Sequence, residues 1–480
     1  MPYVLYAILA AVLLFVLILV LRAANFKPHN DVTVLENDEK FDREITIERL
    51  AKLIRFKTVS YREREKEDDE EFKKLLSSLP ELYPNVFKVC EYNELPDRAI
   101  LFRWNGKNEG DAAVLMAHYD VVPVDESGWE KPAFEGILEN GVLWGRGALD
   151  TKVTFNGVLS AADHLIAEGF TPEFDIYFAF SGGEEVNGKG AVNIVDYFEQ
   201  NNIVPSIVVD EGGAVVENVF PGVKDPCGLI GIAEKGMMDV LYTAHSSGGH
   251  ASAPKPNSPI ARLSKVCLKL DKNIFKYHIT KPAALMFDTL GRHSSFVFKL
   301  VFSNLWLFKG LIDKFLCKKS GGEINALLRT TVAFTQCSGS KASNVIPPKA
   351  QMVSNMRLNP EDSIDSALAQ LKEICDRENV EVELIHGMNP SRISRVDCEA
   401  YKKVASAVAS TWKGSIVSPY LMVQCSDSRH WGRLSDKVYR FSAMDLTSEE
   451  RATIHGHNER IRVDCANRAV EFYIRLMRML

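Results

Sequence analysis

The stretch that decides the fold is FDIYFAFSGGEE, residues 174–185, which joins an apolar run to two glycines and to the adjacent Glu184 and Glu185. A short, continuous apolar run is typical of a strand buried on both faces of a sheet. Two neighbouring carboxylates repel each other, so an exposed turn is the simplest explanation of the pair. A metal site is the alternative, because one carboxylate can bind the cation while the other accepts a proton from water.

Two further segments repeat this pattern, DAAVLMAHYD at residues 111–120 and SIVVDEGG at residues 206–213. A helical pattern, TFNGVLSAADHLIAEG, separates the first strand from residue 174. This alternation predicts an α/β domain around a buried, largely parallel sheet, in which ligands gather outside the carboxyl ends of the strands. The side chains expected at that edge are His118 and Asp120, Glu184 and Glu185, and Asp210 and Glu211.

The nitrogen and oxygen donors that would suit divalent metal ions are His118, Asp150, Glu185, Asp210 and His455. Imidazoles and carboxylates suit Zn²⁺, Co²⁺ or Mn²⁺, and this set contains no thiolate. Two metal ions about 3.5 to 4 Å apart need a bridging carboxylate, for which Asp150 is the candidate. A single histidine at a strand end is more often structural, but the joint occurrence of HYD, GRGALD, GGEE, VVDEGG and IHGHNE favours a metal site.

The motifs MAHYDVVP, WGRGALDTK, SGGEEVNGKGA, VVDEGG, GHASAP and IHGHNER, in this order, resemble the aminoacylase and carboxypeptidase S family of co-catalytic zinc peptidases. The resemblance covers about residues 45–480 and is strongest to the branch that includes carboxypeptidase S and the N-fatty-acyl-amino-acid synthase/hydrolases. It implies a three-layer α/β catalytic domain, interrupted by an α+β lid domain that often mediates dimerisation. A homodimer is therefore an expected assembly.

The resemblance also implies roles for the residues of this chain that match the family's motifs. It implies two divalent metal ions, in the first place Zn²⁺, with His118 and Asp210 binding one ion, Glu185 and His455 binding the other, and Asp150 bridging them. It makes Asp120 the residue that orients His118. Glu184 would be the general base for attack by a metal-held hydroxide, and would then pass the proton to the leaving amine.

Three further residues match the family's substrate contacts. His250 matches a lid histidine that stabilises the oxyanion, in dimeric members from the neighbouring subunit. Asn344 and Arg357 match positions that hold the scissile carbonyl or the substrate carboxylate, and a structural salt bridge is the alternative for Arg357. Gln424 and Cys425 depart from the family's small, flexible residues, which leaves the conformation of that turn open.

The expected organisation is a membrane anchor, a tether, and a catalytic domain split by the lid: residues 1–24, 25–44, 45–233, 234–355 and 356–480. A helical insertion is expected in the lid at residues 271–325. Its aromatic side chains would line a channel for an apolar substrate, touch a membrane surface, or form the core of the lid, and helical spacing favours the core. These side chains are Phe296, Phe298, Phe302, Trp306, Phe308 and Phe315.

The apolar segment Tyr3–Leu21 contains no charged side chain and is long enough to cross a bilayer as a helix. Cleavage after Ala23 or Ala24 is the alternative to an anchor. Arg22 and Lys27 follow the segment and favour a cytoplasmic body by the positive-inside rule. The family resemblance favours a lumenal or extracellular body, which we adopt as the expectation.

Composition excludes several classes of protein. The net charge is −6, so nucleic acid is not an expected partner. The nine cysteines show no CxxC spacing, which indicates neither a disulfide scaffold nor a thiolate zinc site. The sequence thus predicts an anchored dinuclear amidohydrolase that cleaves the amide next to a free carboxylate, in a peptide or in an N-acyl amino acid. Two alternatives are a main role as N-fatty-acyl amino acid synthase/hydrolase and a non-catalytic metal-bearing binding protein.

Overall fold

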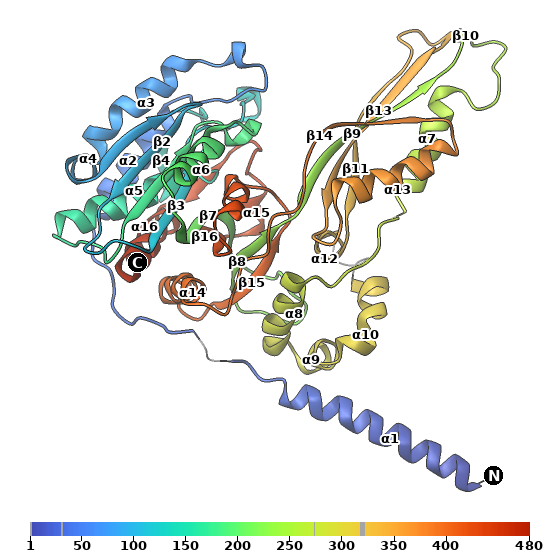
Figure 1. Cartoon of the computed structure of the whole chain (residues 1–480), viewed down its shortest axis with the longest axis horizontal. Helices are drawn as coiled ribbons and strands as arrows, with labels where there is room; N and C mark the ends of the chain where they lie inside the picture. Colours follow the sequence, from blue (N-terminus) through green and yellow to red (C-terminus); the bar gives the residue numbers. More distant parts are fainter. Residues whose placement is uncertain (1, 30–31, 273, 317–321) are drawn as a thin grey trace.

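A computed structural model describes residues 2–29, 32–272, 274–316 and 322–480. An eight-stranded mixed sheet forms the centre of the larger unit (Figure 1). In spatial order its strands are β1 (Glu91–Leu95), β2 (Ala99–Trp104), β6 (Ile176–Ser181), β3 (Ala112–His118), β7 (Pro205–Val216), β16 (Val438–Leu446), β8 (Cys227–Glu234) and β15 (Ile416–Met422). The four strands from β6 to β16 are parallel, as the strand–helix alternation predicts.

Both faces of this sheet are covered, so the unit has three layers. Alternate residues of β3 face opposite ways: Ala113, Leu115 and Ala117 belong to one hydrophobic core, and Val114 and Met116 to the other. The helices on the first face include α2 (Arg43–Arg55), α5 (Lys152–Ala167), α14 (Glu399–Thr411) and α16 (Val463–Met479), and α6 (Gly190–Gln200) covers the second. Outside this layer, α3 (Asp69–Leu82) and α4 (Pro84–Val89) extend the first core.

A second, antiparallel sheet projects from the first (Figure 1). Its strands, in spatial order, are β11 (Thr331–Ser338), β13 (Lys349–Leu358), β9 (Gly236–His245) and β14 (Glu381–Met388). The helices α7 (Pro259–Leu270) and α13 (Ile364–Asp376) share a separate core with it. Because β14 pairs with β9, this unit runs to Met388 and does not end at residue 355, where the sequence predicts the boundary.

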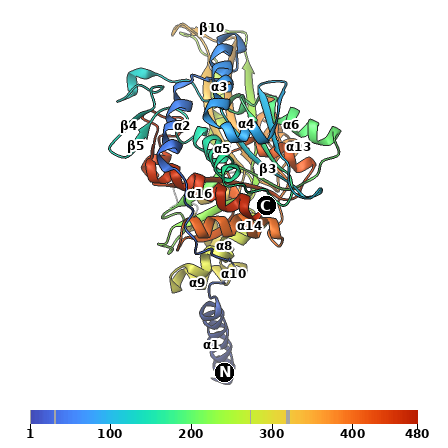
Figure 2. The ribbon, with the colours of Figure 1, turned by 90° about the vertical axis from the view of Figure 1, so that its left-hand side faces the viewer.

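The predicted insertion at residues 271–325 does not join the core of the second sheet. Its helices are α8 (Lys281–His293), α9 (Phe296–Phe302), α10 (Leu305–Leu311) and, at its end, α12 (Glu323–Leu328). They share a core with β8, β15 and Phe26, on the side of the large unit where α1 (Pro2–Asn25) ends. Figures 1 and 2 both show α1 projecting away from α9 and α10.

A small three-stranded sheet joins two segments that are far apart in the sequence. It consists of β17 (Arg460–Arg462), β5 (Val142–Trp144) and β4 (Ile137–Glu139), and the amide of Gly145 donates to the carbonyl of Glu459 at 2.9 Å. This pairing sets the loop that contains Asp150 beside the loop that contains His455. At the far tip of the second sheet lie β10 (Gly249–His250) and β12 (Val345–Ile346), and α15 (Ser448–Arg451) follows β16.

Candidate metal centre

His118 ends strand β3 and is the centre of the site. Its Nδ1 lies 3.3 Å from Oδ1 of Asp120, and its Nε2 lies 3.1 Å from Oδ1 of Asp150 and 3.5 Å from Oε1 of Glu211. Burial lowers the pKa of His118, but Glu211, Asp120 and Asp150 together raise it well above the usual value. The imidazole is therefore held in a strongly negative environment.

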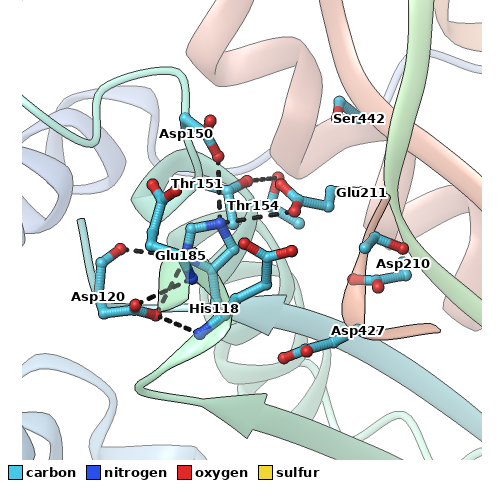
Figure 3. Close-up of polar contacts among 12 residues, drawn as sticks. His118, Asp120, Asp150, Thr151, Thr154, Glu185, Asp210, Glu211, Asp427 and Ser442 are labelled. Atoms are coloured by element: carbon cyan, nitrogen blue, oxygen red, sulfur yellow. Dashed lines mark hydrogen bonds and ion pairs between the residues drawn. The ribbon is translucent and has the colours of Figure 1, made fainter. Parts of the chain in front are cut away.

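Asp120 positions two parts of the site at once. Its two carboxylate oxygens accept hydrogen bonds from the backbone amides of Glu184 and Glu185, at 3.1 and 3.2 Å (Figure 3). Those amides begin a short turn directly after β6, where Gly182 is required because a Cβ would lie 2.7 Å from the ring of Tyr119. A buried carboxylate thus fixes the glutamate pair relative to His118.

Asp150 lies between the two histidines. Its Oδ1 faces His118 and its Oδ2 lies 3.0 Å from Nε2 of His455, which is also 3.0 Å from Oε2 of Glu185. Burial raises the pKa of Asp150, but hydrogen bonds with the two imidazoles outweigh it and leave the pKa well below the usual range. The same two carboxylates raise the pKa of His455 to about 10.

The third strand places its neighbouring carboxylates in different surroundings. In β7, Asp210 is paired with Arg440 and Gly213 with Phe441, so Glu211 and Gly212 form a bulge that turns Glu211 toward His118. Gly212 has a φ of +148°, a conformation that other residues rarely adopt. Asp210 instead accepts a hydrogen bond from the amide of Ser428 at 2.9 Å and lies beside Asp427, away from His118 (Figure 3).

The donor set fits divalent cations. Burial raises the pKa of Glu184, and it raises those of Glu185 and Glu211 to about 7, with a contribution from Asp150 to both. One oxygen of Glu185, Oε1, is buried and has no hydrogen-bond partner. Two groups of side chains have donor atoms within 4.8 Å of one another: His118, Glu184 and Glu211, and His118, Asp150 and Glu185. A bound metal ion would neutralise the negative charge of these carboxylates and give the buried Oε1 of Glu185 a partner.

The predicted substrate contacts are not gathered at this cluster. His250 is exposed on β10, where its Nδ1 contacts Oγ of Ser252 at 2.7 Å, and the carbonyl of the exposed Asn344 accepts from the amide of Ala251. Both residues therefore lie at the far tip of the second sheet (Figure 1). Arg357 is half-buried and its Nη1 lies 3.3 Å from Sγ of Cys425.

A cavity of about 540 Å³ opens beside the cluster. The departure at Gln424 and Cys425 falls on its wall, together with Tyr420. One end of the cavity is lined by Asp150, Glu184, Glu185, Glu211 and His455. The other end is mostly apolar, because these lining side chains belong to or pack against one hydrophobic core: Val219, Phe220, Leu229, Met286, Phe287, Ile324 and Leu327.

Sequence reasoning missed one residue that positions the site, Glu459. Its carboxylate is fully buried and accepts hydrogen bonds from the amides of Leu149 and Asp150, at 2.7 and 3.1 Å, and from Nη1 of Arg146 at 2.6 Å. It thereby holds the backbone on which Asp150 stands. The signal available in the sequence was its place in IHGHNER, four residues after His455.

A mixed α/β sheet that gathers imidazoles and carboxylates at one edge is the arrangement of a metal-dependent hydrolase. The chain belongs to peptidase family M20/M25/M40, whose model matches residues 114–479. It is 31% identical to the probable carboxypeptidase S-like 2 of Dictyostelium discoideum, over 98% of this chain and 92% of that protein. It is also 31% identical to the N-fatty-acyl-amino acid synthase/hydrolase PM20D1 of Xenopus tropicalis, over 93% of this chain and 88% of that protein.

Solved structures agree with the fold. The M20 family metallo-carboxypeptidase Sso-CP2 of Sulfolobus solfataricus matches with a TM-score of 0.67 and 20% identity, over 92% of this chain and 99% of that chain. The family resemblance and the α/β class predicted from the sequence are confirmed. The protein is thus an enzyme, a metal-dependent peptidase or amidohydrolase, and a purely binding role is set aside.

Proposed function

We propose that this enzyme hydrolyses the amide bond between a fatty acyl group and an amino acid with a free carboxylate. The observation that carries this proposal is the cavity, which is apolar at one end and reaches the carboxylate cluster at the other. Burial of an acyl chain stabilises the complex by about 0.8 kcal/mol for each methylene group. The similarity to N-fatty-acyl-amino acid synthase/hydrolases supports the same substrate class. The second candidate is carboxypeptidase activity, which the similarity to a carboxypeptidase S-like protein favours.

Two divalent metal ions, in the first place Zn²⁺, would be held by His118, Asp150, Glu185, Glu211 and His455, with Asp150 between them. We assign Glu211 in place of Asp210 because its carboxylate faces His118. When bound, such ions lower the pKa of water and polarise the amide carbonyl.

Glu184 would move the protons of the reaction. It takes a proton from the attacking water and gives it to the nitrogen of the leaving amine, so that one water and one amide yield a carboxylic acid and an amine. Burial raises the pKa of Glu184 well above its usual range, which makes its carboxylate a stronger proton acceptor. The reverse reaction, condensation of a fatty acid with an amino acid, passes through the same transition state.

Arg357 would bind the carboxylate of the substrate, since its guanidinium lies at Cys425 on the cavity wall. His250 and Asn344 would act on the site of a neighbouring subunit, because both stand exposed at the tip of the second sheet. This arrangement requires a homodimer in which that sheet serves as the lid domain.

We also propose that α1 anchors the enzyme in a membrane, with the body lumenal or extracellular. Within the described residues, α1 is the helix long and apolar enough to cross a bilayer, and most of its surface is exposed. Protease protection tests the topology. Digestion of the body by protease added to intact cells would show a surface location. In sealed vesicles with their cytosolic face outward, digestion only after permeabilisation would show a lumenal body. Digestion of the same vesicles without permeabilisation would show a cytosolic body and refute the proposal.

A matched substrate series tests the proposed activity, using one leaving amine and three acyl groups: N-palmitoyl-leucine, N-acetyl-leucine and alanyl-leucine. We expect the palmitoyl substrate to have the highest kcat/KM. In Glu184→Gln, kcat should fall about 10²- to 10⁴-fold, because the proton acceptor is lost. Glu65→Gln, at an exposed glutamate, is the control. A preference for alanyl-leucine would favour the carboxypeptidase candidate.

The cavity can be tested separately by filling it. Val219→Trp places a larger side chain in the apolar part of the lining, where Val219 packs against the core that contains Phe220 and Phe287. We expect kcat/KM for N-palmitoyl-leucine to fall about tenfold or more, because several methylene groups lose their binding space. N-acetyl-leucine should be hydrolysed as before. Equal loss on both substrates would show that the acyl chain does not occupy this end.

A further inference from the structure

Two short helices, α9 and α10, pack against the apolar helix α1. The guanidinium of Arg22 donates to the carbonyl of Ser303 at 2.9 Å, and Nδ2 of Asn304 donates to the carbonyl of Leu19 at 3.3 Å. Further along α1, the rings of Phe15 and Trp306 meet edge to face, with their centroids 6.1 Å apart. The last turns of α1 are therefore attached to the enzyme body through residues 296–311, which we name the docking hairpin.

The docking hairpin exposes large apolar side chains. Phe296, Val297, Trp306 and Leu307 are between 41% and 70% exposed. Of these, Trp306 contacts Phe15 of α1. A contiguous exposed apolar patch marks a binding surface. The hairpin itself contains Lys299 and Lys309 and no acidic residue. Apolar and basic side chains together match the surface of a bilayer that contains anionic lipids.

The contacts with α1 also set the depth of the hairpin. If Arg22 marks the membrane boundary, Phe15 lies about 10 Å further toward the hydrocarbon, at 1.5 Å per residue. Trp306 is in contact with Phe15 and so stands at the same depth. Helices that lie in the membrane interface bury their apolar faces by about 5 to 10 Å, and tryptophan is enriched there.

The buried face of the hairpin reaches the wall of the cavity. Phe302 of α9 packs against Phe220 and Phe287, with ring centroids 4.6 and 5.5 Å apart, and both of these phenylalanines line the cavity. The same hydrophobic core includes Phe26, at the end of α1. A single hydrophobic core thus lies between the end of α1 and the cavity, and Phe220 and Phe287 belong to both that core and the cavity wall.

We infer that the docking hairpin inserts into the bilayer interface beside α1 and admits acyl substrates to the cavity directly from the membrane. This inference rests on the proposed anchor and on the proposed acyl substrate. Its occupant is the lipid bilayer, because Trp306 of the patch contacts Phe15 of the proposed anchor and the hairpin carries Lys299 and Lys309. A second copy of the chain on this patch is the competing outcome.

Tryptophan fluorescence tests the insertion, because α1 contains no tryptophan and Trp306 is the one tryptophan of the hairpin. The full chain would be reconstituted in phosphatidylcholine vesicles, with and without bromine on the acyl chains. We expect the bromolipid to quench the wild type, and Trp306→Phe to reduce that quenching about threefold or more. Trp144→Phe, on β5, should leave it unchanged.

Equal quenching in the wild type and Trp306→Phe would overturn the inference, as would absence of quenching in an active enzyme. The wild type would be tested for self-association if the bromolipid did not quench it. Self-association that Val297→Asp abolishes would show that the patch is an interface between copies of the chain. Failure to hydrolyse any of the three leucine substrates would instead refute the proposed function. The two failures are therefore distinguishable.

Kinetics test the admission of substrate. Val297 is 70% exposed, so Val297→Asp should fold while placing a charge in the interface. We expect kcat/KM for vesicle-borne N-palmitoyl-leucine to fall about fivefold or more, with N-acetyl-leucine in solution unaffected. Val297→Leu is the matched control and should behave as the wild type. Unchanged turnover of the vesicle-borne substrate in Val297→Asp would overturn uptake through the hairpin.

Discussion

Glu211 and Asp210 are adjacent carboxylates in the middle of β7, and their side chains have different partners. Strand alternation sends consecutive side chains to opposite faces, so only one of them can face His118. The sequence does not contain the register of β7 with β16, and the bulge after Asp210 decides the matter. Asp210 instead accepts a hydrogen bond from the amide of Ser428, in the short 3-10 helix Asp427–Arg433 after β15.

Metal analysis of two variants separates the alternatives at this position. We expect Glu211→Gln to bind about one metal ion fewer per chain than the wild type, because a charged ligand is lost. Asp210→Asn should keep the full metal content, since its carboxylate does not face the cluster. The measurement is metal content after gel filtration, with circular dichroism as the control for folding. Metal loss confined to Asp210→Asn would reverse the assignment.

Other residues of the site differ in how visible they are in a sequence. His118, Asp120, Glu184 and Glu185 follow apolar runs directly, so their common edge was predictable from strand order alone. Glu459 was not, because it acts by accepting backbone hydrogen bonds around Asp150. Backbone partners of that kind leave no pattern in the sequence until the two loops are known to be neighbours.

At the scale of elements, the junction between β8 and β9 connects the two sheets through Lys235. Its buried Nζ donates to the carbonyls of Ala326 and Arg329, at 2.7 and 2.8 Å, and so fixes the end of α12. Ile324 and Leu327 of that helix line the cavity. The lysine therefore supports the cavity wall without touching the carboxylate cluster.

Lys235 predicts a pH dependence of stability. Burial, with a contribution from Arg357, lowers the pKa of Lys235 from 10.5 to about 7 in the folded protein. Between these values the unfolded chain binds the proton and the folded chain does not, so stability rises with pH. From pH 7 to 9 we expect the free energy of unfolding to rise by about 2 to 3 kcal/mol more than in Lys235→Met.

Urea denaturation in detergent at several pH values provides that comparison. The free energy of unfolding should rise less with pH in Lys235→Met than in the wild type, because the two proteins share all other titrating groups. Parallel profiles would show that Lys235 is charged in the folded state. The ionisable neighbours that would then hold its charge are Asp362 and Cys425.

The extent of the second sheet shows why element order is harder to predict than element type. β14 has half-exposed residues along its length. The short connection from α13 to β14 would fit a strand of either the large sheet or the second sheet. Nothing local indicates that its partner is β9, which lies more than a hundred residues earlier. The aromatic insertion is similar: Phe302 is buried as helical spacing favours, whereas Phe296 and Trp306 are exposed. The conformation of the Phe315 side chain lies outside what the structure describes.

At the scale of the whole molecule, His250 lies on β10 at the tip of the second sheet, and we proposed on this basis that two chains make one active site. A subunit exchange test addresses it. Glu184→Gln and His250→Ala should each be nearly inactive, since each lacks one part of the site. Co-expressed with separate tags, they should regain about a quarter of wild-type activity, because half of randomly formed dimers contain one complete site of two.

Purification through both tags should enrich that activity about twofold, because every remaining dimer is mixed. His250→Ala co-expressed with itself under both tags is the control and should stay inactive. If the mixed dimers were no more active than the separate variants, His250 would act within its own chain or not at all. The dimer proposed for the lid would then lose its support.

The chain order of the metal-centre residues has a consequence for how the protein is made. His118, Asp150, Glu185 and Glu211 all precede the second sheet, whereas His455 follows it, with about half of the chain between them. At a synthesis rate of ~5 to 20 residues per second, roughly 10 to 50 seconds separate Glu211 from His455 on the ribosome. During that interval α1 has already emerged, while the small sheet that joins β5 to β17 cannot form. If α1 is the proposed anchor, the nascent chain can therefore reach its membrane before it can become a hydrolase.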